Sequence, residues 1–166
     1  GTGTNVIRNN SIRTNAEGIR ILSGVSGGLL IYNNILADAG YADYGIRNLS
    51  VSLTNLIVSY NFIYSAFDNG TLTGVTNDGT NTISGSVGLN SDGSSSWTGT
   101  IDGGNPGTAD YDLNLTRNDP GAYGGSYSLD NFFPIDGTSS KVFYLQMPSE
   151  ILVGGSNSVT GHSFDR

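Results

Sequence analysis

The chain has 166 residues, a formal net charge of −7, 25 glycines and only 13% charged residues. The acidic balance argues against a nucleic-acid partner, because phosphates would be repelled, and the apolar runs are too short to predict a membrane span. Abundant Gly, Asn, Ser and Thr favour short strands and tight turns over helices, so the composition predicts an all-β protein. The chain has no cysteines and therefore no disulfide framework.

One phrase recurs three times from the N-terminus onward: an apolar pair, a polar pair that ends in Asn, and then an apolar position. The copies are residues 6–12, 30–36 and 57–63. Their second polar residues, Asn10, Asn34 and Asn61, are separated by 24 and 27 residues, a period typical of solenoids. Each repeat is predicted to be two or three short strands that stack on the neighbouring repeat.

Stacking would place equivalent residues about 4.8 Å apart. Asn10, Asn34 and Asn61 are therefore predicted to form a ladder of side-chain amides. Asparagine suits such a corner because it tolerates left-handed backbone geometry, and because its amide donates to one neighbour and accepts from the other. The alternative is that Asn is simply common in turns.

The chain divides into three predicted parts. Residues 1–90 contain three to four coils, residues 91–130 form a turn-rich block, and residues 131–166 form a tail with strand-like runs at 141–147 and 151–153. Because the first repeat begins within five residues of Gly1, we expect the chain to be the C-terminal part of a longer protein with an uncapped first coil. Uncapped strand edges at that coil or in the tail predict homo-oligomers.

The repeats over residues 5 to about 85 resemble the right-handed parallel β-helix (pectate-lyase-like) family. Residues 101–104 (Ile-Asp-Gly-Gly), Arg117 and residues 119–123 (Asp-Pro-Gly-Ala-Tyr) resemble the closing block of secreted β-helix proteins that carry the choice-of-anchor label. The resemblance implies a right-handed parallel β-helix of about three to four coils, whose last open coil the block covers. It also implies a secreted or cell-surface protein, in a bacterium. It implies no single activity, because this scaffold hosts enzymes, adhesins and inert spacers.

The best candidate for a metal site in the sequence is a calcium site. Its candidate ligands are oxygen-bearing residues in the turn-rich block: Asp110, Asp112, Asn114 and Asp119. Alternating oxygen ligands suit a hard cation. An EF-hand would need Gly and Glu where this chain has Leu115 and Gly121, so only a looser Ca²⁺ site is predicted. The alternative is an acidic loop closed by turn hydrogen bonds. No cofactor is required by the sequence.

Aromatic and acidic residues gather after the second and third repeats. The candidate carbohydrate-binding residues are Asp38, Tyr41, Asp43, Tyr44, Arg47, Tyr64 and Asp68. Rings and hydrogen-bonding groups together suit a polysaccharide, although aromatic residues also pack under loops. Arg47 and Arg20 occupy matching Gly-Ile-Arg positions and should repel each other unless a carboxylate intervenes.

The sequence contains one histidine, His162, and no residue marked as a nucleophile. We therefore expect a non-catalytic structural or carbohydrate-contacting module of a secreted or cell-surface protein. Two alternatives remain open. One is a fragment of a polysaccharide lyase or hydrolase whose active site lies mostly upstream. The other is a self-assembling, filament-forming subunit.

Overall fold

The computed structural model describes residues 3–14, 16–38, 44–64, 72–112, 114–125, 128, 141–146 and 160–164. Nearly all of its regular structure is β-strand, and the described helices are two short 3-10 turns, η1 (Thr98–Thr100) and η2 (Thr108–Asp110). The prediction of an all-β chain is confirmed.

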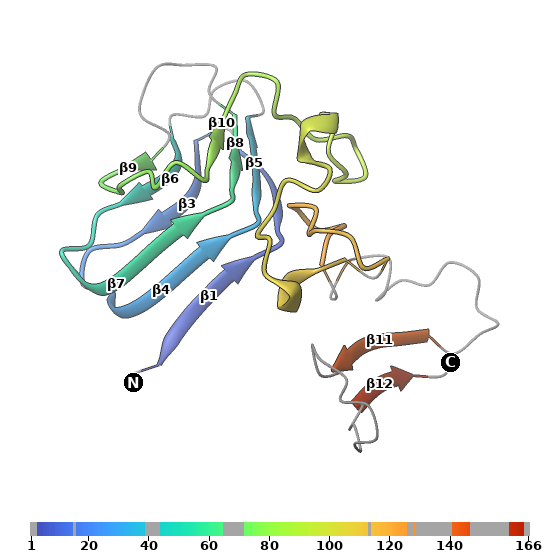
Figure 1. The fold of residues 1–166 in the computed structure, drawn as a ribbon. Helices are drawn as coiled ribbons and strands as arrows, with labels where there is room; N and C mark the ends of the chain where they lie inside the picture. Colours follow the sequence, from blue (N-terminus) through green and yellow to red (C-terminus); the bar gives the residue numbers. More distant parts are fainter. Residues whose placement is uncertain are drawn as a thin grey trace.

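The first ten strands form three separate parallel sheets (Figure 1). The first sheet contains β1 (Thr4–Arg8), β4 (Ser26–Tyr32) and β7 (Ser52–Ser59). The second contains β2 (Ser11–Thr14), β5 (Ile35–Asp38), β8 (Phe62–Ile63) and β10 (Thr82–Ile83). The third contains β3 (Glu17–Ile21), β6 (Tyr44–Asn48) and β9 (Leu72–Thr73). The chain thus visits the sheets in turn, and we call each visit to all three a pass.

Matching apolar residues of successive passes lie in register. Ile7 pairs with Ile31, and Ile31 pairs with Val58. Side chains alternate between the two faces of a strand, so residues that pair in register point to the same face. Ile7, Ile31 and Val58 therefore lie on one face of the first sheet. Ile31 and Ile46 are fully buried in a core cluster that draws on all three sheets, and complete burial of such a side chain stabilises the fold by about 1.5–3 kcal/mol.

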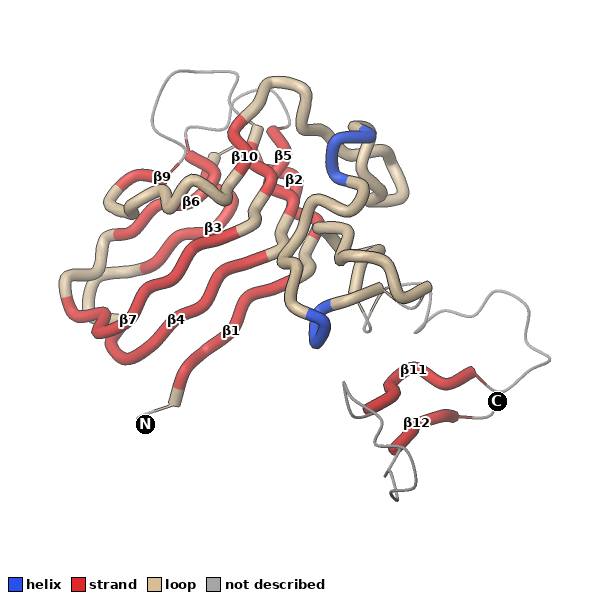
Figure 2. Tube along the Cα trace, in the orientation of Figure 1, coloured by secondary structure: helices blue, strands red, loops and turns tan. Residues whose placement is uncertain are grey.

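A second apolar core lies on the other face of the second sheet. There Ile35 and Phe62 pack with Val87 and Leu89 from the segment that follows β10. The Phe62 ring lies 5.7 Å from the Trp97 ring. Residues 84–100 therefore cover this face, and Figure 2 shows the segment mainly as loop.

The remaining strands pair only with each other among the described residues. β11 (Lys141–Gln146) and β12 (Thr160–Phe164) form a two-stranded antiparallel sheet. β11 falls within the run predicted as a strand at 141–147. The second predicted run, at 151–153, lies outside the described residues, and the strand that pairs with β11 is β12.

Candidate functional site

Each pass turns from the first sheet to the second at two consecutive residues, which we call the corner. The first corner residue has a left-handed backbone: φ is 51° at Asn9, 57° at Asn33 and 53° at Tyr60. The repeat predicted this geometry at the ladder asparagines that follow, and this prediction is wrong. The left-handed residue comes one position earlier, so the two side chains of each corner have different partners.

The second corner residues form the inner row. The Nδ2 atoms of Asn10, Asn34 and Asn61 each donate over 2.9 Å to the Oδ1 atom of the row's next member. Their backbone N–H groups donate to the same Oδ1 atoms over 3.0, 3.1 and 3.0 Å. The structure adds Asn81 as the fourth member. The repeat did not reveal it, because it follows Asn61 by only 20 residues and lacks the apolar pair before it.

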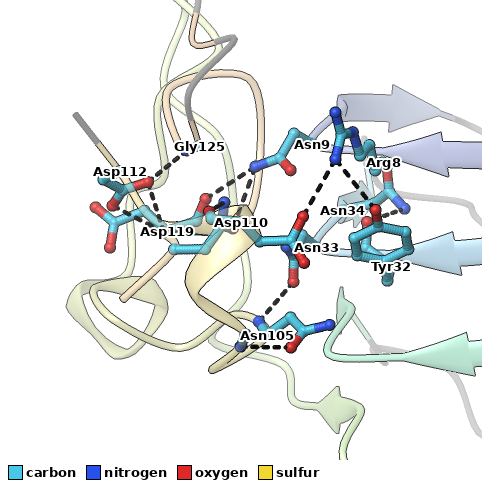
Figure 3. A network of polar contacts seen from close by, with 12 residues as sticks. Arg8, Asn9, Tyr32, Asn33, Asn34, Asn105, Asp110, Asp112, Asp119 and Gly125 are labelled. Carbon is cyan, nitrogen blue, oxygen red and sulfur yellow. Dashed lines mark hydrogen bonds and ion pairs between the residues drawn. The ribbon is translucent and has the colours of Figure 1, made fainter. Parts of the chain in front are cut away.

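The first corner residues form the outer row, which binds the turn-rich block. Asn9 Nδ2 donates to Asn118 Oδ1 over 3.2 Å and to the Gly121 carbonyl over 3.3 Å. Asn33 Oδ1 accepts from the Asn105 N–H over 2.8 Å (Figure 3). In the third pass, the Arg117 guanidinium lies 5.7 Å from the Tyr60 ring centre.

These contacts correct the position expected for the block. The resemblance implied that it covers the last open coil, whereas the described residues of 102–125 lie beside the corners of the first three passes. The signal for this arrangement was the polar or aromatic residue that precedes each ladder asparagine. It was missed because the repeat was defined by the second residue of each pair.

Three carboxylates of the block are partly buried and have raised pKa values. Burial raises the pKa of Asp110, and the Arg8 guanidinium, which donates to it over 3.1 Å, opposes that shift. Burial raises the pKa of Asp112 to about 6, although the carboxylate accepts hydrogen bonds from the backbone of Asp119 and Gly125. Burial also raises the pKa of Asp119, whose carboxylate accepts from the Asp102 N–H over 2.6 Å.

The four predicted calcium ligands do not converge on one point. Asp110 pairs with Arg8, whereas Asn114 Oδ1 accepts from the Thr116 N–H and hydroxyl over 3.1 and 2.7 Å. Asp112 and Asp119 are neighbours. Across the part of the chain that the structure describes, no three His, Cys, Asp or Glu side chains form a group that could hold a metal ion. The calcium site stays a prediction.

A cavity of about 340 Å³ lies between the first corner and the block. It is lined by Arg8, Asn9, Asn10, Ala109, Asp110, Asn118, Gly124 and Gly125. The Arg8 side chain also donates to the Tyr32 hydroxyl over 3.2 Å. The lining combines one ion pair with several amides, which suits a polar, hydrogen-bonding occupant.

Among the residues that the structure describes, two of the predicted carbohydrate-binding side chains, Arg47 and Tyr44, lie against each other. The Arg47 guanidinium lies 5.0 Å from the Tyr44 ring centre on β6, and Glu17 bonds Arg47 over 2.6 Å and Arg20 over 3.3 Å. Glu17 is thus the carboxylate that the stacked arginines required, and no pattern in the sequence pointed to it. Tyr64 packs against the second core. Tyr41, Asp43, Asp68 and the side chain of Asp38 lie outside the described residues.

Within the described ranges, no helix has the length and apolar character needed to cross a bilayer. Comparisons of this chain with protein-family models, with curated proteins and with solved structures find no match.

Proposed function

We propose that this chain is a non-catalytic structural module of a secreted or cell-surface bacterial protein. In this proposal the three parallel sheets are the faces of a right-handed parallel β-helix, and residues 102–125 brace one of its corners. The observation that carries the proposal is the inner row, which links three passes and the residue that leads into β10 with the same 2.9 Å amide hydrogen bond at each step. Such a row fixes each pass against its neighbours, as stacked repeats require.

The use of the polar groups also supports a structural role. Asn34 and Asn61 are fully buried, and their amides bind neighbouring passes. The Asp112 carboxylate accepts hydrogen bonds from the backbone N–H groups of Asp119 and Gly125 in its own block. These groups stabilise the fold, because a buried polar group that lost its partner would cost about 1–3 kcal/mol.

Hydrogen exchange of side-chain amides tests the scaffold. We expect the Asn34 and Asn61 amide protons to exchange far more slowly than those of Asn90, which is exposed. Circular dichroism should show a β-rich chain with negligible helix. Equal exchange at all three residues would contradict the scaffold proposal.

A reaction assay tests the non-catalytic part. Incubation with pectic and other acidic polysaccharides should release neither unsaturated products nor new reducing ends. Turnover that disappears with Arg47→Ala, and persists with Arg20→Ala from the same arginine pair, would overturn the proposal in favour of a lyase or hydrolase.

Carbohydrate contact is a second candidate function, favoured by the Arg47–Tyr44 pair on β6. Because Glu17 pairs with both Arg47 and Arg20, this surface suits a neutral glycan better than an acidic one. On a glycan array, retention lost with Tyr44→Ala but kept with Tyr64→Ala would support this function. Equal retention by both variants would count against it.

A further inference from the structure

Another cavity, of about 230 Å³, lies where the segment that covers the second sheet meets the turn-rich block. We call it the cover pocket. It is lined by residues 94–98, Thr100 and Ile101 from the covering side, and by Asp119, Pro120 and Tyr123 from the block. Its volume is below the range of about 300–1,000 Å³ that drug-sized ligands occupy, so it suits a small molecule or a single side chain.

Both walls of the cover pocket are anchored to the second sheet and its corners. On one side, Trp97 packs against Phe62, with the ring centres 5.7 Å apart. On the other side, the N–H of Gly121, which follows the buried Pro120, donates to the Asn33 carbonyl over 2.8 Å. The fold therefore forms the pocket in advance, which lowers the conformational cost of binding a ligand.

The apolar part of the pocket consists of two aromatic rings and one aliphatic side chain. The Tyr123 hydroxyl donates to the Asp92 carbonyl over 3.0 Å, which holds the tyrosine ring in place. Gly99 lies so close to the Trp97 indole that a Cβ atom there would come within 2.5 Å of the indole Cζ2. Ile101 is 61% exposed. Because Gly99 already covers part of the indole, the ring is better suited as a wall for an aliphatic chain than as a platform for a sugar ring.

The charged residue of the lining is Asp119, and no arginine in the described ranges forms an ion pair with it. Its Oδ1 atom accepts a hydrogen bond from the Asp102 N–H over 2.6 Å. Burial and the neighbouring Asp102 carboxylate both raise the pKa of Asp119. In the same block, by contrast, Asp110 is paired with Arg8. A partly buried carboxylate without a counter-ion favours a cationic ligand, because the cation stabilises its charged form.

Two hydroxyl groups of the lining are available as hydrogen-bond acceptors. The hydroxyls of Ser95 and Thr100 donate to the Trp97 carbonyl over 2.9 and 2.8 Å. The hydroxyls of Ser96 and Thr98 belong to exposed residues and form no hydrogen bond with another described residue. A primary ammonium group carries three N–H donors. Its donors therefore match the carboxylate and hydroxyl oxygens that line this pocket.

We propose that the cover pocket binds a primary alkylammonium group, with the charged nitrogen at Asp119 and the aliphatic chain against Trp97 and Tyr123. This inference goes beyond the structural role, because it gives the module a ligand site. The same chemistry has two sources: a free aliphatic diamine, or the lysine side chain of a partner protein.

The fluorescence of Trp97, the single tryptophan of the chain, tests the inference because this residue lines the pocket. The full 166-residue chain is titrated at constant ionic strength with putrescine, a four-carbon diamine, and with lysine blocked at its α-amino and carboxyl groups. We expect a saturable change with at least one of them. Tighter binding of putrescine identifies a free amine as the ligand, and tighter binding of the blocked lysine identifies a side chain. The matching four-carbon diol, which is uncharged, should give no saturable change.

Asp119→Asn should weaken amine binding at least about tenfold, because the amide is uncharged although its oxygen can still accept from the Asp102 N–H. Asp92→Asn removes the same charge from an exposed residue outside the lining and should leave binding nearly unchanged. Ile101→Lys leaves Asp119 intact at an exposed position. Its own ammonium group should occupy the pocket and weaken amine binding at least about tenfold, whereas Ile101→Met should not.

The inference would be overturned by the absence of a saturable change with either amine, or by an equal response to the diol. Equal binding by the Asp119→Asn and Asp92→Asn variants, or full binding by Ile101→Lys, would also overturn it. A response to glucose or to Ca²⁺ without any response to the amines would assign the pocket to a sugar or to a metal ion instead.

Discussion

Asn34 has hydrogen-bond partners on every side of its amide. Its Nδ2 donates to the Ile7 carbonyl over 3.1 Å and to the Tyr32 carbonyl over 3.0 Å, in addition to Asn61 Oδ1. Its Oδ1 accepts two hydrogen bonds from Asn10. A buried amide satisfied in this way ties three passes together, whereas Asn10, at the exposed end of the row, ties two.

The substitution Asn34→Ala should therefore lower the free energy of unfolding by about 1–3 kcal/mol, because several buried groups lose their partner. Asn10→Ala is the matched control and should cost clearly less, since water can reach the open end of the row. Urea unfolding of both variants measures the difference. Equal losses would show that position in the row has no energetic consequence.

The Asp112 carboxyl makes stability depend on pH. Its pKa is raised by burial to about 6 in the folded chain, above the ordinary 3.8. At a pH between these two values, the folded state holds a proton that the unfolded state has released. The stabilisation by the protonated form is present below the ordinary pKa and is lost as the pH rises through the folded value. Asp110 and Asp119, whose pKa values are also raised by burial, act in the same direction.

We therefore expect the melting temperature to rise when the pH is lowered from 7 to about 4.5, a window set by the folded and unfolded pKa values of Asp112. Asp112→Asn should flatten much of this dependence, because the amide oxygen can still accept a backbone N–H but no longer titrates. Calorimetric scans across this range test it. A melting temperature that falls on acidification would contradict the assigned shifts.

At the scale of the elements, residues 84–100 matter because they cover the second sheet. Val87 is 1% exposed in the second core, so Val87→Ala should lower the free energy of unfolding by about 1–3 kcal/mol through lost apolar contact. Val51→Ala makes the same chemical change at a residue that is 100% exposed and should have almost no effect. Denaturant midpoints of the two variants measure the difference. Similar midpoints would mean that residues 84–100 do not unfold together with the second sheet.

The sequence predicted those elements whose pattern repeats. The asparagine phrase located the strands on either side of each corner, and the Gly-Ile-Arg cue located β3 and β6, because in-register stacking places like residues together. It did not predict where the turn-rich block lies. That position depends on contacts such as Asn9 with Asn118, which are 109 residues apart and leave no local periodicity. The pairing of Glu17 with Arg47 was missed for the same reason.

At the scale of the whole molecule, the β11–β12 sheet stands apart in its pairing from the three parallel sheets. A two-stranded sheet alone is marginally stable in water, so it gains from pairing with further strands. The tail is therefore our candidate for the contact in the predicted homo-oligomer.

We expect oligomers of the intact chain that a version ending at Gly137 does not form. The shortened chain should keep its urea midpoint, because the contacts that bind the described block to the corners come from residues 102–125. Light scattering over a range of concentrations measures the association. An intact chain that stays monomeric throughout would rule out association through the tail.

The passes differ in length, yet their corners coincide. Successive members of the inner row are 24, 27 and 20 residues apart, and each step keeps a 2.9 Å hydrogen bond. The connection from the second sheet to the third spans two residues after β2, five after β5 and eight after β8. The side of the passes away from the corner therefore carries connections of different length. That side is where new loops can be grafted, by evolution or by an engineer, without changing the spacing of the passes.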